Sequence, residues 1–499
     1  MRLSSPGVTN DLKRNGPWAV LSGVLGALLF FPFDLWYLAP LALVPLLLAL
    51  RRTETVRAAG YLALIFGWVM ALISLHWLWR IFSTGMIGVC VLLALPWLLF
   101  GLAYRTLAPR LSPIALLLAT PVLYTGMEWV RCQGWYFRFS WLQLGTSYVA
   151  SQASQSTYPL VGVYGMTFLT VLVSAAIAAA LAQTERSQRL WGLAGTAALI
   201  VALAVGFRVA WLVRSAHAPE EHKAVSVLMV QSETEDLDWL IARTEEYARA
   251  RPQLIVWPEL AVSEYVRDDP ETFARLQALA GKMNATLVLG CKSHVPAGVR
   301  CDWLRRRAML QAAGELYYNS AAIFTPAGLI GEYHKRHPIQ FFADGVPGPG
   351  YPVWWPPDSG LGGLGVAICY DLDFPDTALS LTRNGAQLLV VPTFDARDWG
   401  PVQQRQHARL ALARAAEVGR WIVRPTSSGV SQIIAPGGEQ VAFIPTGEAD
   451  HRLGIVQPRT DRTPYVQGVW VLPYVCVGVS VLLVVWGLWW RRRRSDGER

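Results

Sequence analysis

Three short segments of this 499-residue chain supply a carboxylate, an ammonium and a thiol, in that order along the sequence. The residues are Glu259, Lys335 and Cys369. A thiol needs a base to become a nucleophile, and the oxyanion that it creates on a carbonyl needs a positive or hydrogen-bonding partner. The three groups together therefore indicate attack by a cysteine on a carbonyl carbon, without the help of a histidine.

Taken singly, each of these residues has an ordinary structural explanation. Glu259 follows a predicted strand, where α/β sites usually gather, but a surface or helix-capping glutamate is the commoner finding. Lys335 stands in the charged run 331–337, which is typical of a solvated surface. Cys369 ends the apolar run 364–368, where a buried structural cysteine is as common as a reactive one. Only their combination in one region favours chemistry.

The region 214–466, which carries all three residues, has the pattern of a soluble α/β domain. Short apolar runs typical of strands alternate with helical patterns, which favours a layered sheet. The expected strands are 225–230, 254–256, 285–289, 319–324, 364–369, 387–391 and 421–424, and the expected helices are 237–250, 270–282 and 401–418.

The rest of the chain is too apolar for an ordinary soluble protein. The composition is 53% hydrophobic, with 22 tryptophans. A membrane span needs about 20 apolar residues, and runs of this kind are predicted at 17–33, 36–50, 58–79, 86–104, 112–130, 159–182, 190–213 and 467–490. We therefore predict about eight spanning helices in three parts. These are a seven-helix domain at 1–213, the α/β domain at 214–466, and a last span with a basic tail at 467–499.

The net charge of +9 comes from short basic clusters beside the apolar runs, which is typical of topology signals and argues against a nucleic-acid partner. With eight spans all of these clusters fall on one side, and positive charge marks the cytoplasmic side. The region 214–466 is then periplasmic. The clusters are Lys13 with Arg14, Arg51 with Arg52 and Arg57, Arg105 with Arg110, Arg186 with Arg189, and Arg491 to Arg494.

The loop 131–158 is rich in aromatic residues, which prefer the membrane interface. We expect it to lie along the outer face of the bilayer near the active site; a plain capping loop is the alternative. The six cysteines match no zinc pattern, and His334 and His337 have no evident third ligand, so we expect neither metal nor cofactor. Cys291 and Cys301 leave two alternatives open, a disulfide or two free thiols.

Taken together, the segments resemble the carbon–nitrogen hydrolase (nitrilase) superfamily, whose triad is Glu-Lys-Cys. Residues 254–259 resemble its strand ending in the general base, and 318–320 with 331–337 resemble its hairpin leading to the lysine. Residues 366–375 resemble its nucleophile elbow. The resemblance implies an αββα sandwich. It continues through Arg383–Ala386, Pro392-Thr393, His407–Arg409 and Glu417–Arg420.

The membrane half narrows the resemblance to one branch, the apolipoprotein N-acyltransferases, in which such a domain lies between the seventh and eighth of eight spans. The segments Phe33–Trp36, Glu128-Trp129, Trp141–Gly145 and Gly162–Gly165 are similar to that branch. The resemblance implies that Glu259 is the general base, Lys335 stabilises the oxyanion and Cys369 is the nucleophile. The implied auxiliary or oxyanion residues are Tyr370, Asp344, Asp371 and Asn319, and the implied substrate-binding residues are Trp141 and Trp257.

The sequence departs from that branch at three places. That branch usually has a Pro-Phe-Gly-Glu segment with an auxiliary glutamate, and the corresponding residues 338–345 differ here. Asp344 is the candidate replacement for the glutamate, and it is offset by one residue from the expected position. Because an aspartate reaches less far, the orientation of Lys335 is an open question. The Gly-Phe-Pro-Trp loop reads Arg-Phe-Ser-Trp at 138–141, and Thr-Asn-x-Gly reads Thr-Ser-Ser-Gly at 426–429. These changes leave open an altered acceptor or a divergent paralogue.

The resemblance implies a two-step acyl transfer in the bacterial inner membrane by a monomer. An sn-1 acyl chain passes from a phospholipid to Cys369 as a thioester, and then to the N-terminal amine of a diacylated apolipoprotein. One alternative is a membrane-tethered amidase-type hydrolase, in which water takes the acyl group. Another is a catalytically weak lipid-binding membrane protein.

Overall fold

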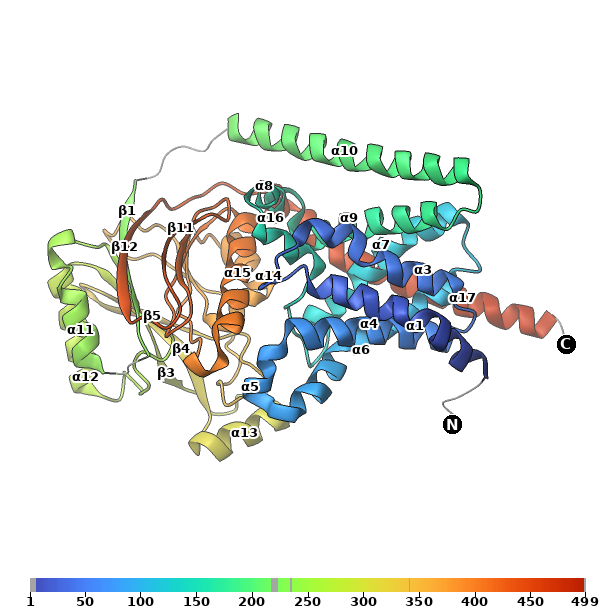
Figure 1. The fold of residues 1–499 in the computed structure, drawn as a ribbon. Coiled ribbons are helices and arrows are strands. Elements are labelled where there is room, and N and C mark those ends of the chain that lie inside the picture. Colours follow the sequence, from blue (N-terminus) through green and yellow to red (C-terminus); the bar gives the residue numbers. More distant parts are fainter. Residues whose placement is uncertain (1–5, 217–222, 234–235, 341, 498–499) are drawn as a thin grey trace. The chain divides into compact units, whose positions relative to one another are not determined.

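The computed structural model describes residues 6–216, 223–233, 236–340 and 342–497. The chain divides into two compact units (Figure 1). The first unit comprises Met1–His217 and Gly468–Arg499, and the second comprises Ala218–Gln467. The second unit is therefore an insertion between two helices of the first.

The first unit is helical throughout its described residues. Its long helices are α1 (Pro6–Ala27), α4 (Val56–Ser74), α6 (Met86–Leu107), α7 (Pro113–Trp129), α9 (Tyr158–Leu181), α10 (Arg186–Ala216) and α17 (Leu472–Gly497). Its short helices are α2 (Ala39–Ala42), α3 (Val44–Arg52), α5 (Trp79–Phe82) and α8 (Gln152–Gln155). The remaining single turns are η1 (Trp36–Leu38), η2 (His76–Leu78), η3 (Ser83–Gly85), η4 (Val130–Gly134), η5 (Leu144–Ala150) and η9 (Val469–Val471).

Six stretches of the described chain are long and apolar enough to cross a membrane. They are Val56–Ser74, His76–Leu107, Pro113–Gly134, Tyr158–Leu181, Arg186–Ala210 and Val469–Trp490. The first two of the eight expected spans are not among them. The helix expected at 17–33 begins already at Pro6, so its first half is polar, and the run 36–50 is divided among η1, α2 and α3.

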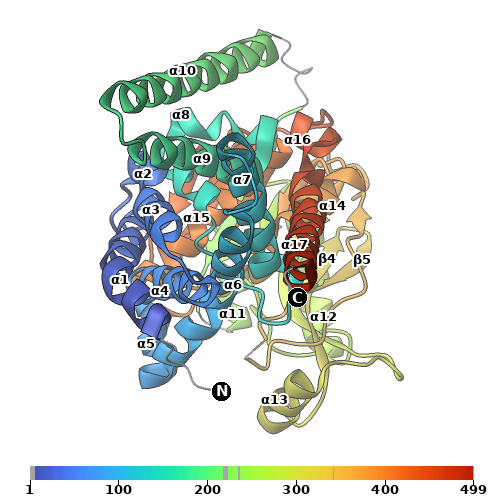
Figure 2. The same ribbon diagram turned by 90° about the vertical axis from the view of Figure 1, so that its right-hand side faces the viewer.

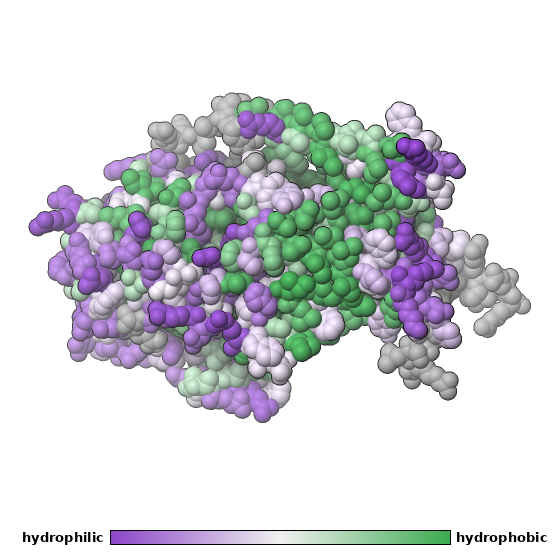
Figure 3. All heavy atoms as spheres, in the orientation of Figure 1, coloured by the Kyte–Doolittle hydropathy of each residue, from purple (hydrophilic) through white to green (hydrophobic). Residues whose placement is uncertain are grey.

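Small residues let the helices of this unit approach closely, as is common between membrane helices. A Cβ at Gly67 of α4 would lie 2.3 Å from the ring of Trp97 on α6. The C-terminal helix α17 packs against α7 in the same way, and the rings of Trp129 and Tyr474 lie 5.0 Å apart there (Figure 2). Apolar side chains cover much of the surface of this unit (Figure 3). Among the large exposed ones are Ile114, Trp191, Val201, Leu482 and Val485.

Basic residues from several helices gather at one end of this unit. Three contacts there join α1 to the end of α3, the end of α6 to the residues after α3, and the residues after α6 to α17. They are a hydrogen bond from Arg14 to the carbonyl of Arg52, one of 3.3 Å from Arg105 to the carbonyl of Glu54, and the guanidinium of Arg110 over the ring of Trp490 at 5.9 Å. Most of the basic clusters noted in the sequence therefore share one end.

The loop 131–158 is folded against the helices rather than extended. It contains η4, which is a π-helical turn, η5 and α8. The buried carboxylate of Glu128 on α7 accepts the N–H of Leu144 at 2.8 Å and the hydroxyl of Thr167 at 2.6 Å. These contacts join the loop to α7 and α9; its place at a bilayer surface stays a prediction.

The second unit contains two six-stranded sheets. The first has the order β12-β1-β2-β3-β4-β5, and the second has the order β11-β10-β9-β8-β7-β6. In each sheet three adjacent strands are parallel, and the outer pairings are antiparallel. The strands are β1 (Val225–Gln231), β2 (Leu254–Val256), β3 (Thr286–His294), β4 (Tyr317–Thr325), β5 (Gly328–His334), β6 (Val353–Trp354), β7 (Leu364–Val366), β8 (Leu388–Val390), β9 (Trp421–Arg424), β10 (Ser431–Ile434), β11 (Gln440–Ile444) and β12 (Asp450–Val456).

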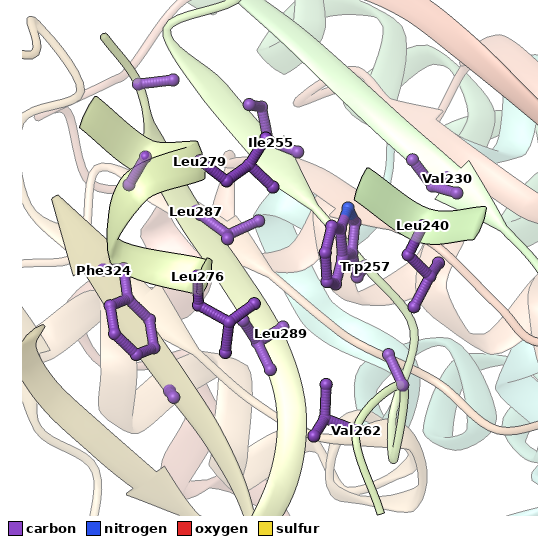
Figure 4. Close-up of a cluster of buried hydrophobic side chains, with 14 of the residues drawn as sticks. Val230, Leu240, Ile255, Trp257, Val262, Leu276, Leu279, Leu287, Leu289 and Phe324 are labelled. Atoms are coloured by element: carbon purple, nitrogen blue, oxygen red, sulfur yellow. The ribbon is translucent and has the colours of Figure 1, made fainter. Parts of the chain in front are cut away.

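The sheets pack face to face and helices cover their outer faces, which makes an αββα sandwich. Gly454 of β12 lies so near Ile433 of β10 that a Cβ there would meet the isoleucine at 2.3 Å. Side chains of α11 and α12 form a buried cluster with β1 to β4 (Figure 4), while α14 and α15 contact the second sheet. The helices and turns are α11 (Leu237–Glu245), η6 (Ala248–Ala250), α12 (Pro270–Met283), α13 (Trp303–Ala313), η7 (Cys369–Asp373), α14 (Pro375–Arg383), η8 (Arg397–Trp399), α15 (Pro401–Val418) and α16 (Pro464–Gln467).

Each strand expected from the sequence is present; the ends of 254–256 and 421–424 are as expected, and the ends of the others are shifted. The strand expected at 364–369 ends at Val366, and the helix expected at 237–250 ends at Glu245. The hairpin strand β5, the short strand β6 and the strands β10 to β12 were not predicted as separate strands. Several of these are partly exposed and carry polar residues, so their apolar signal is weak.

Candidate active site

Glu259 lies just beyond the C-terminal end of β2, which ends at Val256. The neighbouring strand β3 comes very close here, because the N–H of Gly290 donates to the carbonyl of Pro258 at 3.0 Å. A Cβ at Gly290 would lie 2.2 Å from the backbone nitrogen of Leu260 and 2.5 Å from the Cα of Glu259. Glycine at this position therefore allows the turn that places the carboxylate.

Lys335 follows the end of β5 and is held by the neighbouring strand β4. Its N–H donates to the carbonyl of Asn319 at 2.8 Å. The side chain is only 1% exposed, and its Nζ lies 2.7 Å from Oε1 of Glu259 and 2.8 Å from Oδ2 of Asp344. One buried ammonium therefore forms ion pairs with two carboxylates.

Asn319 and Asp344 complete the surroundings of the lysine. The amide Nδ2 of Asn319 donates to Glu259 at 2.7 Å and to Asp344 at 2.8 Å. Asp344 also accepts the N–H of Ile339 at 2.8 Å. The sequence left open whether the shorter side chain of Asp344 could reach Lys335. In the structure it does, because the backbone of the loop brings its carboxylate within hydrogen-bonding distance of the ammonium.

Cys369 begins the turn η7 after β7 and has a φ of 51°, a left-handed conformation that is uncommon for a non-glycine residue. Its N–H donates to the carbonyl of Pro392 at 2.9 Å. Its Sγ lies 3.6 Å from the carbonyl oxygen of Phe394, whose N–H donates to Oε2 of Glu259 at 2.7 Å. The main chain of Phe394 therefore connects the thiol with the carboxylate.

Burial dominates the electrostatics of the three groups. It raises the pKa of the Cys369 thiol well above its ordinary value, and the nearby Glu259 raises it further. Burial also raises the pKa of Glu259, against the opposing effect of Lys335. For Lys335 burial lowers the pKa, but Asp344 and Glu259 outweigh it, so the pKa lies well above its ordinary value. The resting site therefore holds a neutral thiol beside a charged ammonium, and Glu259 is a stronger base than an exposed glutamate.

Asp371 joins two segments of the site and does not face the thiol. Its Oδ2 accepts the hydroxyl of Tyr333 at 2.8 Å and the N–H of Ile368 at 3.1 Å. Its Oδ1 accepts the N–H of His337 at 2.6 Å. Asp371 thereby ties the strand before Cys369 to the loop after Lys335, which is a positioning contact.

The aromatic residues expected in the site have different surroundings. The ring of Tyr370 packs against that of Phe374 at 5.0 Å. Trp257 is fully buried in the hydrophobic cluster of the first sheet, and its ring N–H donates to Thr244 at 3.0 Å (Figure 4). The expectation that Trp257 binds substrate is therefore wrong, since its side chain has no surface to offer. Trp141 belongs to the helical unit and is 4% exposed; its role stays a prediction.

Sequence reasoning missed Phe394 as part of the site. The residue contributes through its backbone N–H and carbonyl, which have no signature in the sequence. The only available signal was its place directly after a predicted strand and Pro392-Thr393. Cys291 and Cys301 are free thiols, so the disulfide alternative is not realised. Within the ranges that the structure describes, no three or more histidine, cysteine, aspartate or glutamate side chains are placed so that they could hold a metal ion.

Comparison with known families agrees with this architecture. The family of carbon–nitrogen hydrolases matches residues 179–462, which include the strands, the helices and all three groups of the site. The second unit is therefore a carbon–nitrogen hydrolase domain. The N-terminal domain of apolipoprotein N-acyltransferases matches residues 22–176.

Curated relatives extend the similarity over nearly the whole chain. The apolipoprotein N-acyltransferase of Azotobacter vinelandii is 30% identical, over 96% of this chain and 95% of its own. That of Methylococcus capsulatus is 27% identical, over 96% of both chains. A crystal structure of an amidase from Nesterenkonia sp. is 21% identical, with a TM-score of 0.38 over 50% of this chain and 94% of the amidase. The chain belongs to the apolipoprotein N-acyltransferase family.

Proposed function

We propose that this acyltransferase moves an sn-1 acyl chain from a phospholipid, through a thioester on Cys369, to the N-terminal amine of a diacylglyceryl-cysteine lipoprotein. The observation that carries the proposal is the buried arrangement in which Lys335 contacts Glu259 at 2.7 Å while Phe394 joins Glu259 to the thiol. All of these groups come from one chain, so we propose that a monomer is sufficient.

In the first step the thiol attacks the ester carbonyl. Glu259 takes the proton of Cys369 as the S–C bond forms, because the neutral thiol is the resting state. The ammonium of Lys335 and the backbone N–H of Tyr370 stabilise the oxyanion. When the oxyanion collapses, the ester C–O bond breaks, and Glu259 returns the proton to the leaving oxygen of the lysophospholipid. A thioester remains on Cys369.

In the second step the amine of the lipoprotein attacks the thioester. Glu259 accepts a proton from the amine nitrogen as the C–N bond forms, and the same two groups stabilise the oxyanion. The C–S bond then breaks, and the proton passes to the sulfur, which restores the thiol of Cys369. The thioester supplies the energy of the amide bond, so the residues of this site need no nucleotide.

The proposed substrates explain why the domain is anchored by helices. Each carries acyl chains whose removal from the bilayer costs about 0.8 kcal/mol per CH₂ group, so the enzyme has to meet both at the membrane. We propose that the second unit lies on the periplasmic side of the bacterial inner membrane. In support, Arg186 and Arg189 lie at the start of α10, the run Arg491–Arg494 lies in the last part of α17, and basic side chains gather at one end of the first unit. Positive charge favours the cytoplasmic side.

Epitope tags test this orientation. A tag inserted at Gly298, in an exposed loop of the second unit, is expected to bind antibody in intact spheroplasts. The matched control carries the same tag after Arg499 and is expected to bind antibody only after permeabilisation, because the basic end of α17 is cytoplasmic in the proposal. The reverse pattern would refute the proposed orientation.

Labelled phospholipid tests the proposed reaction. We expect full-length enzyme, given phosphatidylethanolamine with a radiolabelled sn-1 chain, to transfer the label to a diacylglyceryl-cysteine peptide and to release an equal amount of lysophospholipid. The matched acceptor is the same peptide with an acetylated amine, which has no nucleophilic nitrogen and is expected to remain unlabelled. Equal release of free fatty acid with both peptides would instead establish a hydrolase, and absence of any reaction would refute the proposed transfer and favour a lipid-binding protein.

A further inference from the structure

Four charged side chains lie buried together outside the triad, in the second unit. They come from η7, the loop after β8, α15 and β9, so four segments meet here. His407 lies at the centre: its Nδ1 is 2.6 Å from Asp395 and its Nε2 is 3.1 Å from Asp373. Arg424 donates to the other oxygen of Asp395 at 3.0 Å. The exposed fractions are 2% for Asp373, 0% for Asp395, 4% for His407 and 1% for Arg424.

The contacts determine the protonation of His407. Ionised carboxylates only accept hydrogen bonds, and a neutral imidazole has only one N–H to donate. Because both ring nitrogens face carboxylates, the ring needs both protons. The guanidinium of Arg424 lies 2.9 Å from Nδ1 and opposes the charge on the ring, but Asp395, to which both cations donate, and Asp373 favour that charge more strongly. Two cations and two anions thus balance. Burial lowers the pKa of His407, but Asp395 and Asp373 outweigh it and raise the pKa to about 9.

The two carboxylates that His407 joins belong to the two segments that hold the reacting thiol. Asp373 is the last residue of η7, the turn that begins with Cys369 in its left-handed conformation. Asp395 follows Phe394, whose N–H holds Glu259 and whose carbonyl oxygen lies 3.6 Å from the thiol. Movement of either segment would change the distance between nucleophile and base.

We propose that His407 is a positioning residue of the acyl transfer. Its imidazolium donates to Asp373 and to Asp395, and so fixes the turn that begins with Cys369 relative to the loop whose Phe394 binds Glu259. This inference rests on the proposed function, because it assigns His407 to the formation of the thioester. The residue touches no reacting atom and acts through Asp373 and Asp395. The device depends on charge, because loss of one proton removes one of the two ring donors.

The sign of the pH dependence follows from the raised pKa. In the unfolded chain a histidine has a pKa of about 6.5, below the folded value of about 9. The imidazolium therefore stabilises the fold fully below the unfolded value, and this contribution is lost as the pH rises through about 9. The groups that face the ring are Asp373, Asp395 and Arg424. Acylation should decline over the same range.

The test measures only the first half-reaction, so no acceptor amine contributes to the pH profile. Formation of the hydroxylamine-labile acyl-enzyme from labelled phosphatidylethanolamine is followed between pH 6 and about 10, across the interval bounded by the two pKa values. We expect His407→Gln to lower the maximal rate by about 10- to 100-fold, as for a small misplacement of reacting groups, with the KM for phospholipid unchanged. The decline near pH 9 should disappear from the profile of this variant.

Two further variants keep the test sharp. Asp373→Asn preserves the shape of the turn but removes one anion that raises the pKa, so the decline should move to lower pH. Arg405→Gln removes one positive charge from an exposed position of the same helix and should leave rate and profile unchanged. If wild type forms the adduct and His407→Gln has the same rate and pH profile, the inference is wrong. If wild type forms no adduct, the proposed function fails instead.

Discussion

The variant Cys369→Ala is expected to form no acyl adduct with labelled phospholipid and to transfer nothing to a peptide amine. Removal of a nucleophile costs about 10⁶-fold in comparable enzymes, because the remaining groups have no covalent step to support. The fold should persist, because the contact of the thiol with the carbonyl of Phe394 is long, at 3.6 Å, and alanine fits the same turn. Gel analysis of hydroxylamine-labile label, with a thermal unfolding curve, measures both expectations.

Two matched variants make this prediction specific. Cys301→Ser changes a half-exposed thiol of the same unit and should leave the adduct intact. Cys369→Ser should form at best a slow oxyester that resists hydroxylamine better, because the hydroxyl is the weaker nucleophile. If the adduct persists in Cys369→Ala, or is lost in Cys301→Ser, Cys369 is not the thiol that carries the acyl group.

The second large effect is expected for Lys335→Met. Removal of the ammonium leaves the buried Glu259 beside the partly exposed Asp344, with Asn319 donating to both. We expect a loss of about 10²–10³-fold in the rate of acylation, because one donor to the oxyanion is missing. Breaking a buried ion pair also costs about 3–5 kcal/mol of unfolding free energy. Acylation kinetics and denaturant unfolding measure the two effects separately.

A double variant separates chemistry from stability at this site. In Lys335→Met with Asp344→Asn, one carboxylate is neutralised, so most of the lost stability should return while acylation stays slow. Asp344→Asn alone keeps the contact between Lys335 and Glu259 at 2.7 Å, and should cost far less activity than loss of the lysine. Recovery of activity in the double variant would show that Lys335 only balances charge.

The positions of Glu259 and Cys369 were predictable because each residue follows an apolar run that the sequence shows clearly. Glu259 follows β2, whose three residues are all strongly apolar, and Cys369 follows the apolar run 364–368 that contains β7. Lys335 was predicted from the resemblance, and its place in a charged run gave no sign that it would be only 1% exposed. A charged side chain can be buried when partners from other segments neutralise it, here Glu259 and Asp344. The local sequence around the lysine does not show that these partners are present.

The contacts that position the triad were less predictable. Phe394 acts through its main chain, and His407 joins residues that are 34 and 12 positions away in the sequence. Trp257 was expected at the substrate only from the resemblance, and its ring instead packs into the hydrophobic cluster of the first sheet. In the helical unit, hydropathy found the later spans but did not show that 36–50 is divided into short helices.

The central claim is that Cys369 holds the acyl group and passes it to an amine. The most direct measurement is a single-turnover chase, in which the acyl-enzyme is formed, freed of phospholipid, digested and examined by mass spectrometry before and after addition of a diacylglyceryl-cysteine peptide. The account predicts that the acyl mass lies on the fragment containing Cys369 and then appears as an amide on the added peptide. An acyl mass on any other fragment, or its release as free fatty acid in the presence of the peptide, would contradict it.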